Sequence, residues 1–336
     1  MLLHLAVTLI ATLAAFAATA LIRRNAQRLG IVQAPNDRSS HTVPTPSGGG
    51  VGIVVGGSIA TAFAAVAAPS PYGIGLVIAL VVAAIGFWDD RRPIAARFRL
   101  PAQLLLVALA IGFCIPLDAL QQQTGLPPPA LFIAAVAVIV VTYWINLFNF
   151  MDGIDGIAGS QAVVMCCSAA LLIGGSAPPA FWVLIGIAAA TLGFLVLNWP
   201  PAKIFMGDAG STYLGFMIAL LALVTIADGH VSLAQWVILA AAFVTDATVT
   251  LTRRLLLRER VFEAHRRHAY QKLSRRWGSH RSVTLAFIGL NFIWLLPLAW
   301  LASIPGWMWA AVFVAYLPLI GLAVYLRAGA PETAAA

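Results

Sequence analysis

The chain has 336 residues, of which 61% are hydrophobic and only 10% are charged. This composition excludes a soluble globular protein, because so few polar side chains could not cover the surface of a folded chain of this size. The net charge of +8 is compatible with nucleic-acid binding, but the positions of the basic residues argue against it. The three cysteines lie in apolar runs, without metal-ligand spacing or disulfide partners, and are interpreted as small hydrophobic residues: Cys114, Cys166 and Cys167.

Apolar segments recur from one end of the chain to the other, and no polar block is long enough to form a second domain. A helix that crosses about 30 Å of hydrocarbon needs about 20 apolar residues. We therefore predict a single all-α polytopic membrane domain over residues 1–336, with about eleven transmembrane helices, of which the third is short. The predicted spans are 2–22, 48–68, 73–88, 100–117, 128–146, 158–176, 180–198, 210–227, 234–252, 282–302 and 306–326.

All 20 Lys and Arg residues fall on one side of this predicted topology. With a periplasmic N-terminus, the cytoplasmic segments hold 4, 4, 0, 1, 10 and 1 of them, in the order 23–47, 89–99, 147–157, 199–209, 253–281 and the C-terminal tail. Because cytoplasmic loops are enriched in Lys and Arg, this split predicts a cytoplasmic C-terminus and a site on the cytoplasmic face. Basic residues follow the first span and none precedes it, which favours an uncleaved helix over a signal peptide.

The third predicted span ends in Gly-Phe-Trp followed by Asp89 and Asp90. Two adjacent carboxylates at a helix C-terminus oppose the helix dipole and repel each other. A local cost of this kind is typical of an active site. The alternative is that Arg91 and Arg92 merely neutralise the two acids at the membrane surface, and the motif alone does not decide between them.

The fifth predicted span leads into the run Asn146-x-x-Asn149-x-x-Asp152-Gly-x-Asp155-Gly. Its two Asp-Gly pairs predict turns with positive φ at the glycines and with free backbone amides. If the helix continues, Asn146, Asn149 and Asp152 lie roughly on one side of it and offer the oxygen ligands that Mg²⁺ takes. Two surface Asx turns are the alternative, but they leave the asparagines near the bilayer unexplained.

The loop after the seventh predicted span reads Phe-Met-Gly-Asp208-Ala-Gly-Ser. It places a carboxylate and free amides at the N-terminus of the eighth span, where a phosphate and its metal bind well. Taken alone, an ordinary N-cap role for Asp208 is the simpler interpretation.

The longest predicted cytoplasmic segment, 253–281, contains the run from His265 to His268. Arg and His at this density can bind a diphosphate, and the absence of Cys from the run argues against a zinc site. A second polar segment, 37–50, has prolines that hold the chain extended and glycines that allow close backbone approach. A stiff loop that helps helices to pack is the alternative for this segment.

Motifs of other classes are absent from the sequence. There is no Walker A loop, no Gly-x-Gly-x-x-Gly at a strand–helix junction and no nucleophile elbow. No internal repeat or Gly-broken pair of helices indicates a transporter. The polar residues concentrate instead at the membrane surface, where a lipid headgroup meets a soluble substrate.

Taken together, these segments resemble the polyprenyl-phosphate N-acetylhexosamine-1-phosphate transferases, the superfamily of the MraY and WecA enzymes (glycosyltransferase family 4). The motifs around Asp89, Asn149 and Asp208 come in the family's order, and the resemblance covers nearly the whole chain. Eleven spans with the start outside are similar to the WecA branch. The Arg/His run departs from the family's common His-x-His-His form, since only His268 keeps its place. This variant is closer to the one in enzymes that initiate O-antigen or another surface polysaccharide.

The resemblance implies transfer of an N-acetylhexosamine-1-phosphate from a UDP-sugar to undecaprenyl phosphate in the bacterial inner membrane, giving undecaprenyl-diphospho-sugar and UMP. Mg²⁺ is the expected cofactor, with Mn²⁺ as an alternative ion. Expected partners are a UDP-N-acetylhexosamine, undecaprenyl phosphate, the lipid bilayer and a second copy of the chain in a homodimer. No nucleic acid is expected.

The resemblance also implies roles for individual residues. Asp208 would bind Mg²⁺ with help from Asn149, and Asp89, with Asp90 beside it, would accept a proton from the lipid phosphate or orient it. Where the chain departs from the family's pattern, Tyr270 and Gln271 offer an aromatic face and an amide, from which we predict that they contact the sugar and influence which donor is used. The nucleotide-sugar contacts would be Asn146, Asp152, Asp155, His265, Arg266 and His268, and the lipid-phosphate contacts His41 and Thr45.

Two other functions remain as alternatives. A CDP-alcohol phosphotransferase also has Asp-Gly repeats, but its signature places Ala-Arg soon after the first Asp-Gly, and residues 152–159 contain no Arg. A lipid carrier or flippase should line a path across the bilayer with polar groups, whereas the middles of these spans are apolar.

Overall fold

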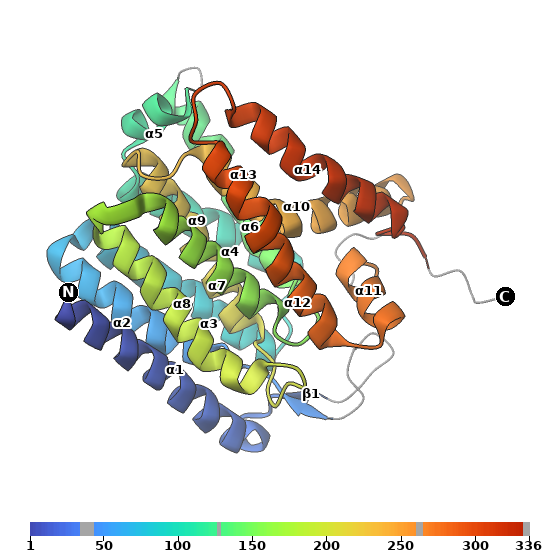
Figure 1. The fold of residues 1–336 in the computed structure, drawn as a ribbon. Coiled ribbons are helices and arrows are strands. Elements are labelled where there is room, and N and C mark those ends of the chain that lie inside the picture. The colour runs from blue at the N-terminus through green and yellow to red at the C-terminus, as the bar shows by residue number, and fades with distance from the viewer. Residues whose placement is uncertain (34–43, 126–128, 260–264, 332–336) are drawn as a thin grey trace.

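The structure, a computed structural model, describes residues 1–33, 44–125, 129–259 and 265–331. Within these ranges nearly all of the chain is helical, and the strands are a two-residue antiparallel pair, β1 (Val32–Gln33) and β2 (Thr45–Pro46). Figure 1 shows the helices packed side by side in one bundle. The predicted all-α membrane fold is thereby confirmed.

Each of the eleven predicted spans corresponds to one helix or to a helix with a short irregular turn. Ten of these segments are long and apolar enough to cross a membrane, and α2 is a slightly shorter apolar helix of 17 residues. The helices in the predicted spans are α1 (Leu2–Leu29), α2 (Val51–Ala67), α3 (Ile74–Arg91), α4 (Ala96–Cys114), α6 (Ala130–Phe150), α7 (Ile157–Ile173), α8 (Pro179–Asn198), α9 (Asp208–Ala227), α10 (Leu233–Leu256), α12 (His280–Leu290) with α13 (Leu296–Leu301), and α14 (Met308–Tyr325).

Two helices lie outside the predicted spans. The first is α5 (Leu117–Thr124), in the segment predicted to be an outer loop, and the second is α11 (Ala269–Trp277), in the long basic segment. Both are too short to cross a bilayer, so they leave the predicted topology unchanged. The second of them shapes the site described below.

The centre of the bundle is α9, whose most apolar stretch is 89% buried, against 17% for α1 and 22% for α14. A helix that is apolar on all sides can be covered by neighbouring helices or by lipid. Here α9 is covered by protein, while α1 and α14 turn most of their surface outward, where hydrocarbon would meet them. The residues at the ends of α9 are therefore held from several directions.

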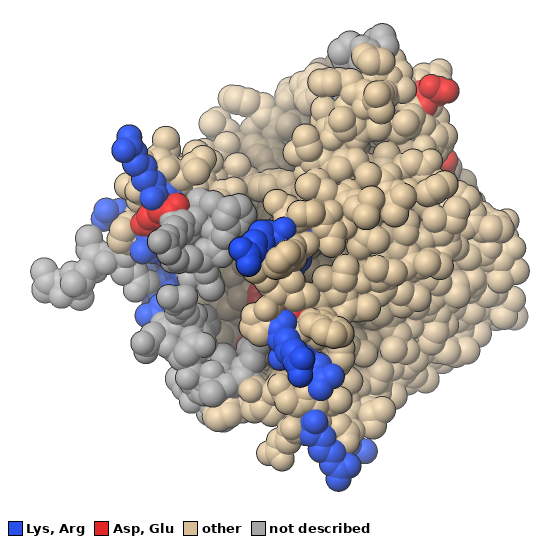
Figure 2. Space-filling model, turned by 180° about the vertical axis from the view of Figure 1, so that it is seen from behind, with Lys and Arg blue, Asp and Glu red and all other residues tan. Residues whose placement is uncertain are grey.

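Figure 2 shows that Lys and Arg side chains gather toward one end of the molecule. This is the spatial counterpart of the charge split along the chain, because loops that alternate along the sequence meet at the same end of an up-and-down bundle. The orientation of this end toward the cytoplasm stays a prediction.

Single cysteines in a chain whose three native cysteines are replaced by Ala test the orientation. Both Ser303 and Arg276 are exposed. We expect a membrane-impermeant maleimide to label Ser303→Cys in intact cells, and to label Arg276→Cys only after the membrane is made permeable, because basic loops stay in the cytoplasm. Labelling of Arg276→Cys in intact cells would reverse the topology.

Candidate active site

The N-terminus of α9 lies in close contact with the end of α3 and the start of α2. Glycines permit this approach: a Cβ atom on Gly86 would overlap the backbone of Asp208, and one on Gly50 would overlap the backbone of Gly210. The amide of Gly50 also donates a hydrogen bond to the carbonyl of Met206, at 2.9 Å. The close backbone approach predicted for the glycines before the second span is therefore present.

The carboxylate of Asp90 binds the first turn of α9. Its Oδ1 accepts a hydrogen bond from the amide of Asp208 at 2.8 Å, and its Oδ2 accepts one from the amide of Ala209 at 3.1 Å. Gly207 precedes the helix with φ of 77°, and a Cβ there would overlap the Asp90 carboxylate. The amides predicted to be free for phosphate are thus already bound, and Asp90 positions Asp208 from the neighbouring helix.

Asp89 and Asp208 meet at the guanidinium group of Arg99, which lies in the first turn of α4. Arg99 forms an ion pair with Asp89 and a second one with Asp208, at 3.2 Å. Asp89 also accepts the amide of Ile94 at 2.5 Å, and its side chain is only 8% exposed. Two acids that are 119 residues apart in sequence therefore share one cation.

Sequence reasoning did not single out Arg99. It is one of four basic residues in the segment 89–99, and all four fitted the role of anchors at the membrane surface. Arg97 and Arg99 both lie in the first turn of α4, so their position separates them from Arg91 and Arg92 but not from each other. A cation placed there points back toward the end of the preceding helix.

Asp152 adds a further carboxylate to this cluster. Burial raises its pKa well above the ordinary range, and the negative charges of Asp208, Asp90 and Asp155 raise it further. A site with this much negative charge gains from a bound cation, because a divalent ion offsets the mutual repulsion of the acids.

The oxygen donors around Asp208 fit a magnesium ion. The side-chain oxygen of Asn149 accepts a hydrogen bond from the Ser211 hydroxyl at 2.9 Å, which holds the amide beside α9. Across the described ranges, no three Asp, Glu, His or Cys side chains are arranged as a ready-made metal cage. Mg²⁺ commonly takes one or two carboxylates together with water and substrate phosphates, so this sparse set suits it.

Asn146, Asn149 and Asp152 do not line one side of a helix, and this prediction is wrong. The helix α6 ends at Phe150, before Asp152. Steps of three residues also drift by about 60° each around a helix of 3.6 residues per turn. As a result Asn146 donates to the side chain of Gln103 on α4, at 2.7 Å, whereas Asn149 faces α9.

Asp155 braces the loop in which it lies. One carboxylate oxygen accepts the amide of Ala202 at 2.9 Å, and the other lies 3.2 Å from Nδ1 of His280. Its carbonyl accepts the hydroxyl of Thr284 at 2.9 Å. The loop after α6 is thus tied to the loop after α8 and to the start of α12. That Asp155 also shapes a nucleotide pocket stays a prediction.

A cavity of about 450 Å³ opens beside the acidic cluster, between α4, α6 and α10. Apolar side chains form most of its wall. Its polar members are Arg99, Asn146, Thr142, Tyr143, Thr250, His265 and His268. The structure therefore brings the two predicted histidines of the basic segment to the same cavity as Arg99, which pairs with Asp89 and Asp208.

His265 is a neutral imidazole in this cavity. Its pKa is lowered to about 3, mainly by burial and also by the nearby His268, Arg254 and Arg267. Its Nδ1 accepts a hydrogen bond from the backbone amide of Arg267 at 3.3 Å, so the ring hydrogen is on Nε2. The ring also stacks on that of His268, with 4.9 Å between centroids.

Tyr270 and Gln271 do not face a substrate, and the prediction that they contact the sugar is wrong. Tyr270 is fully buried and Gln271 is 6% exposed. The Tyr270 hydroxyl donates to the carbonyl of Phe150 at 3.1 Å, and it lies where a side chain at Gly153 would be. These residues hold α11 against the loop that follows α6, because α11 buries its apolar side.

The remaining predicted contacts are placed less centrally. Thr45 is buried in β2 and does not line the cavity. Arg266 is partly exposed, and its carbonyl accepts a hydrogen bond from Arg275 at 2.8 Å. His41 lies outside the residues that the structure describes.

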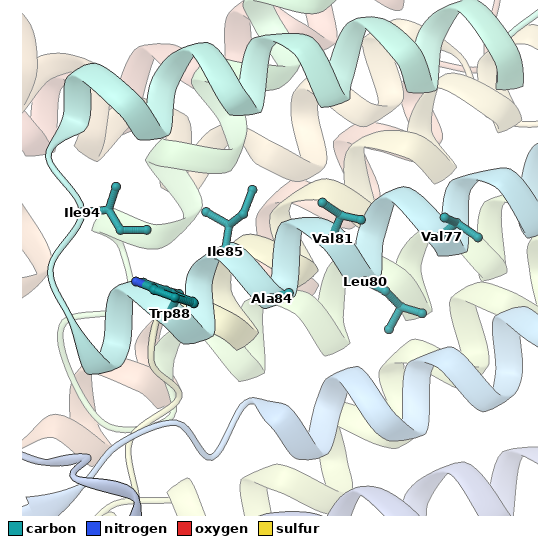
Figure 3. Close-up of a pocket in the computed structure, with 7 residues that line it drawn as sticks. All are labelled: Val77, Leu80, Val81, Ala84, Ile85, Trp88 and Ile94. Carbon is teal, nitrogen blue, oxygen red and sulfur yellow. The ribbon is translucent and has the colours of Figure 1, made fainter.

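A second groove, of about 580 Å³, runs along the outer side of α3 (Figure 3). Its walls are apolar: Val77, Leu80, Val81, Ala84, Ile85, Trp88 and Ile94. No charged side chain lines it, so it cannot stabilise a phosphate. The first cavity, at which charged and apolar groups meet, is therefore the candidate site.

Comparison with known proteins agrees with this geometry. The sequence profile of glycosyl transferase family 4 matches residues 72–226, which include Asp89, Asn149 and Asp208. A probable undecaprenyl-phosphate N-acetylglucosaminyl 1-phosphate transferase of Bacillus subtilis is 26% identical over 313 residues, which cover 90% of this chain and 85% of that protein. These matches support a relation to the polyprenyl-phosphate N-acetylhexosamine-1-phosphate transferases.

Other polyprenyl-phosphate transferases match over similar lengths. The undecaprenyl-phosphate alpha-N-acetylglucosaminyl 1-phosphate transferase of Escherichia coli (strain K12) is 28% identical, covering 90% of this chain and 86% of that protein. The decaprenyl-phosphate N-acetylglucosaminephosphotransferase of Mycobacterium tuberculosis is 29% identical, covering 86% and 79%. These relatives are consistent with the WecA branch of the family.

The buried neutral state of His265 predicts an acid-sensitive fold. The unfolded chain binds a proton at this residue below a pH of about 6.5, whereas the folded chain does so only near a pKa of about 3. Stability is therefore lost as the pH falls from about 6.5 toward 3. The variant His265→Phe keeps an aromatic ring but has no group to protonate. We expect its Tm to fall less than that of the unsubstituted protein when the pH is lowered from about 7.5 to about 5. Equal losses in Tm would contradict this assignment.

Proposed function

We propose that this protein transfers an N-acetylhexosamine-1-phosphate from a UDP-sugar to undecaprenyl phosphate. An oxygen of the lipid phosphate attacks the phosphorus that bears the sugar, and the bond from this phosphorus to the bridging oxygen of UMP breaks. The products are undecaprenyl-diphospho-sugar and UMP. The relatives in Bacillus subtilis and Escherichia coli are named as N-acetylglucosaminyl 1-phosphate transferases for undecaprenyl phosphate, which supports this reaction.

The proposal rests on one observation: the acidic cluster and the apolar cavity share Arg99. The guanidinium group pairs with Asp89 and Asp208 and also lines the cavity between α4, α6 and α10. A polyprenyl phosphate has the same two parts, an anionic head and a long hydrocarbon chain. Its head would reach Arg99 while the first isoprene units lie along the apolar wall.

The reaction brings two anions together, so its main demand is electrostatic. Arg99 would attract the phosphate of the lipid, and the partly exposed Arg266 would attract the diphosphate of the donor. His265 carries its ring hydrogen on Nε2 and can donate it to a phosphate oxygen. Arg99 and His265 are in place before substrate arrives, because Asp89 and Asp208 hold the guanidinium group and contacts with Arg267 and His268 hold the imidazole ring.

Asp89 would orient the lipid phosphate or accept its proton. The amide of Ile94 and the guanidinium of Arg99 fix this carboxylate beside Arg99, which itself lines the cavity. Asp90 contributes indirectly, since both of its oxygens bind the first turn of α9. The two adjacent acids therefore have different roles in the proposal.

Asp208 and Asn149 would hold Mg²⁺, or Mn²⁺ in its place. Their oxygen atoms are of the type that this ion prefers, and Asp90 and Ser211 hold them in position. When bound, the ion would offset the negative charge of the donor diphosphate. Asp152 lies near enough to Asp208 to feel its charge and would complete the acidic wall.

We further propose that the reaction takes place at the cytoplasmic face of a bacterial inner membrane and starts the assembly of a surface polysaccharide, such as O-antigen. The donor would be a UDP-N-acetylhexosamine. Both of its substrates can reach the site there, because the nucleotide sugar arrives from water and the lipid from the bilayer.

The direct experiment is a transfer assay with purified protein in detergent, undecaprenyl phosphate and radiolabelled UDP-N-acetylhexosamines, with Mg²⁺ present or removed by chelation. We expect the label to move into a lipid-extractable product and UMP to appear in equal amount. Transfer to lipid without release of UMP, or no transfer with any UDP-N-acetylhexosamine, would reject the proposed function.

Asp208→Asn tests the ion site. The substitution keeps the shape and the cap of α9 but removes the charge, so we expect kcat to fall at least ~100-fold, about 2.7 kcal/mol of barrier. The matched control is Asp228→Asn, since Asp228 is an exposed acid at the opposite end of the same helix. We expect the control to keep its turnover. Unchanged turnover in Asp208→Asn would show that Asp208 is only a helix cap.

A further inference from the structure

Asp246 is a buried carboxylate in α10 that the proposed chemistry does not use. The residue is 4% exposed, and a carboxylate within an apolar span is costly unless it is paired and needed. Its Oδ1 accepts the amide of Ala269 at 2.8 Å and the hydroxyl of Thr250 at 3.2 Å, and its Oδ2 accepts the amide of Tyr270 at 2.9 Å. Asp246 therefore holds the N-terminus of α11.

The same carboxylate also holds an imidazole. Oδ1 of Asp246 lies 3.2 Å from Nδ1 of His268, and the two side chains are 5% and 4% exposed. An oxygen that already accepts hydrogen bonds from an amide and a hydroxyl is an acceptor toward the ring as well. Nδ1 of His268 therefore carries a hydrogen.

The other ring nitrogen of His268, Nε2, is available to a group bound in the cavity. The ring is held between His265 and Tyr270, with centroid distances of 4.9 Å and 5.5 Å, and His268 lines the cavity together with Arg99. In the part of the chain that the structure describes, Nε2 of His268 has no hydrogen-bond partner. Two stacking contacts and one carboxylate thus fix where this nitrogen points.

We propose that Asp246 is a positioning residue for the transfer reaction. It fixes the orientation of His268 and the tautomer with the hydrogen on Nδ1, so that the lone pair of Nε2 can accept a hydrogen bond from a protonated phosphate oxygen of the substrate. A carboxylate behind an imidazole commonly has this effect, both in metal sites and in hydrolases. This inference rests on the proposed function, because the group that Nε2 meets is the substrate phosphate.

Other charged groups surround the ring and belong to the same environment. Arg99 of α4 shares the cavity, and His265 stacks on the ring. Arg254 of α10 and Arg267 lie close enough to lower the pKa of His265. Asp246 is the acid in direct contact with His268, and Glu259, which pairs with Arg254 and Arg267, is a further acid near the two rings.

A double-mutant cycle separates this role from simple capping of α11. We expect Asp246→Asn to lower kcat roughly 10–100-fold, with a smaller effect on KM for the UDP-sugar. In a His268→Ala background, the same substitution should change kcat less than about threefold, because residues that act as one unit are not additive. An undiminished loss in that background would show that Asp246 only caps the helix.

Gln271→Ala is the matched control. Gln271 caps α11 by accepting the amide of His268 at 3.3 Å, and its loss should lower Tm, as Asp246→Asn does, but keep kcat within about threefold. A loss of kcat in Gln271→Ala equal to that of Asp246→Asn would overturn the proposal.

If Asp246→Asn does not fold, Thr250→Val removes another donor to the same oxygen. Its expected loss of about two- to fivefold should vanish in the His268→Ala background, and persistence there would contradict the proposal.

The outcomes distinguish the two proposals. If the unsubstituted protein transfers no sugar phosphate, the proposed function fails and the cycle is not needed. If it transfers and Asp246→Asn is as active as the unsubstituted protein, the proposed function stands and the positioning role of Asp246 is wrong.

Discussion

The contact between Asp90 and the first turn of α9 joins two helices that come from distant parts of the chain. A helix begins with amides that have no partner within the helix, and near a bilayer such groups need a partner from elsewhere in the protein. Asp90 supplies it from the end of α3. The same contact sets the position of Asp208, and through Asp208 the position of Arg99.

This contact also accounts for a cost that is visible in the sequence. A carboxylate at the C-terminus of a helix opposes that helix's dipole. Asp90 is such a carboxylate, at the end of α3. It also lies at the N-terminus of α9, however, where a negative charge is favourable. Gly86 and Gly50 let the backbones come near enough for this exchange. A local conflict is thus resolved by a tertiary contact, and the two helices are fixed in register.

The same arrangement recurs elsewhere at this end of the bundle. Asp155 joins the loop after α6 to the loop after α8, and Asp246 joins α10 to the start of α11. In each case a carboxylate of one element binds amides of another. The loops that carry the polar residues are therefore held by the spanning helices, which are rigid because their apolar sides are packed around α9. Precise placement of a few polar groups on such a frame is what a reaction between two anions needs.

Much of the architecture followed from the sequence alone. The length and spacing of the apolar runs determined the helices, since only a helix satisfies its own backbone in hydrocarbon, and the charge split predicted their direction. The acids Asp89 and Asp208 stood out because their local surroundings were unfavourable or their motif was distinctive. Tertiary structure alone decided how each acid is used. It paired Asp90 with α9 and Asp89 with Arg99, it buried Tyr270, and it turned Asn146 and Asn149 toward different helices. These outcomes depend on which helix ends meet, and residues more than a hundred positions apart carry no local signal of that meeting.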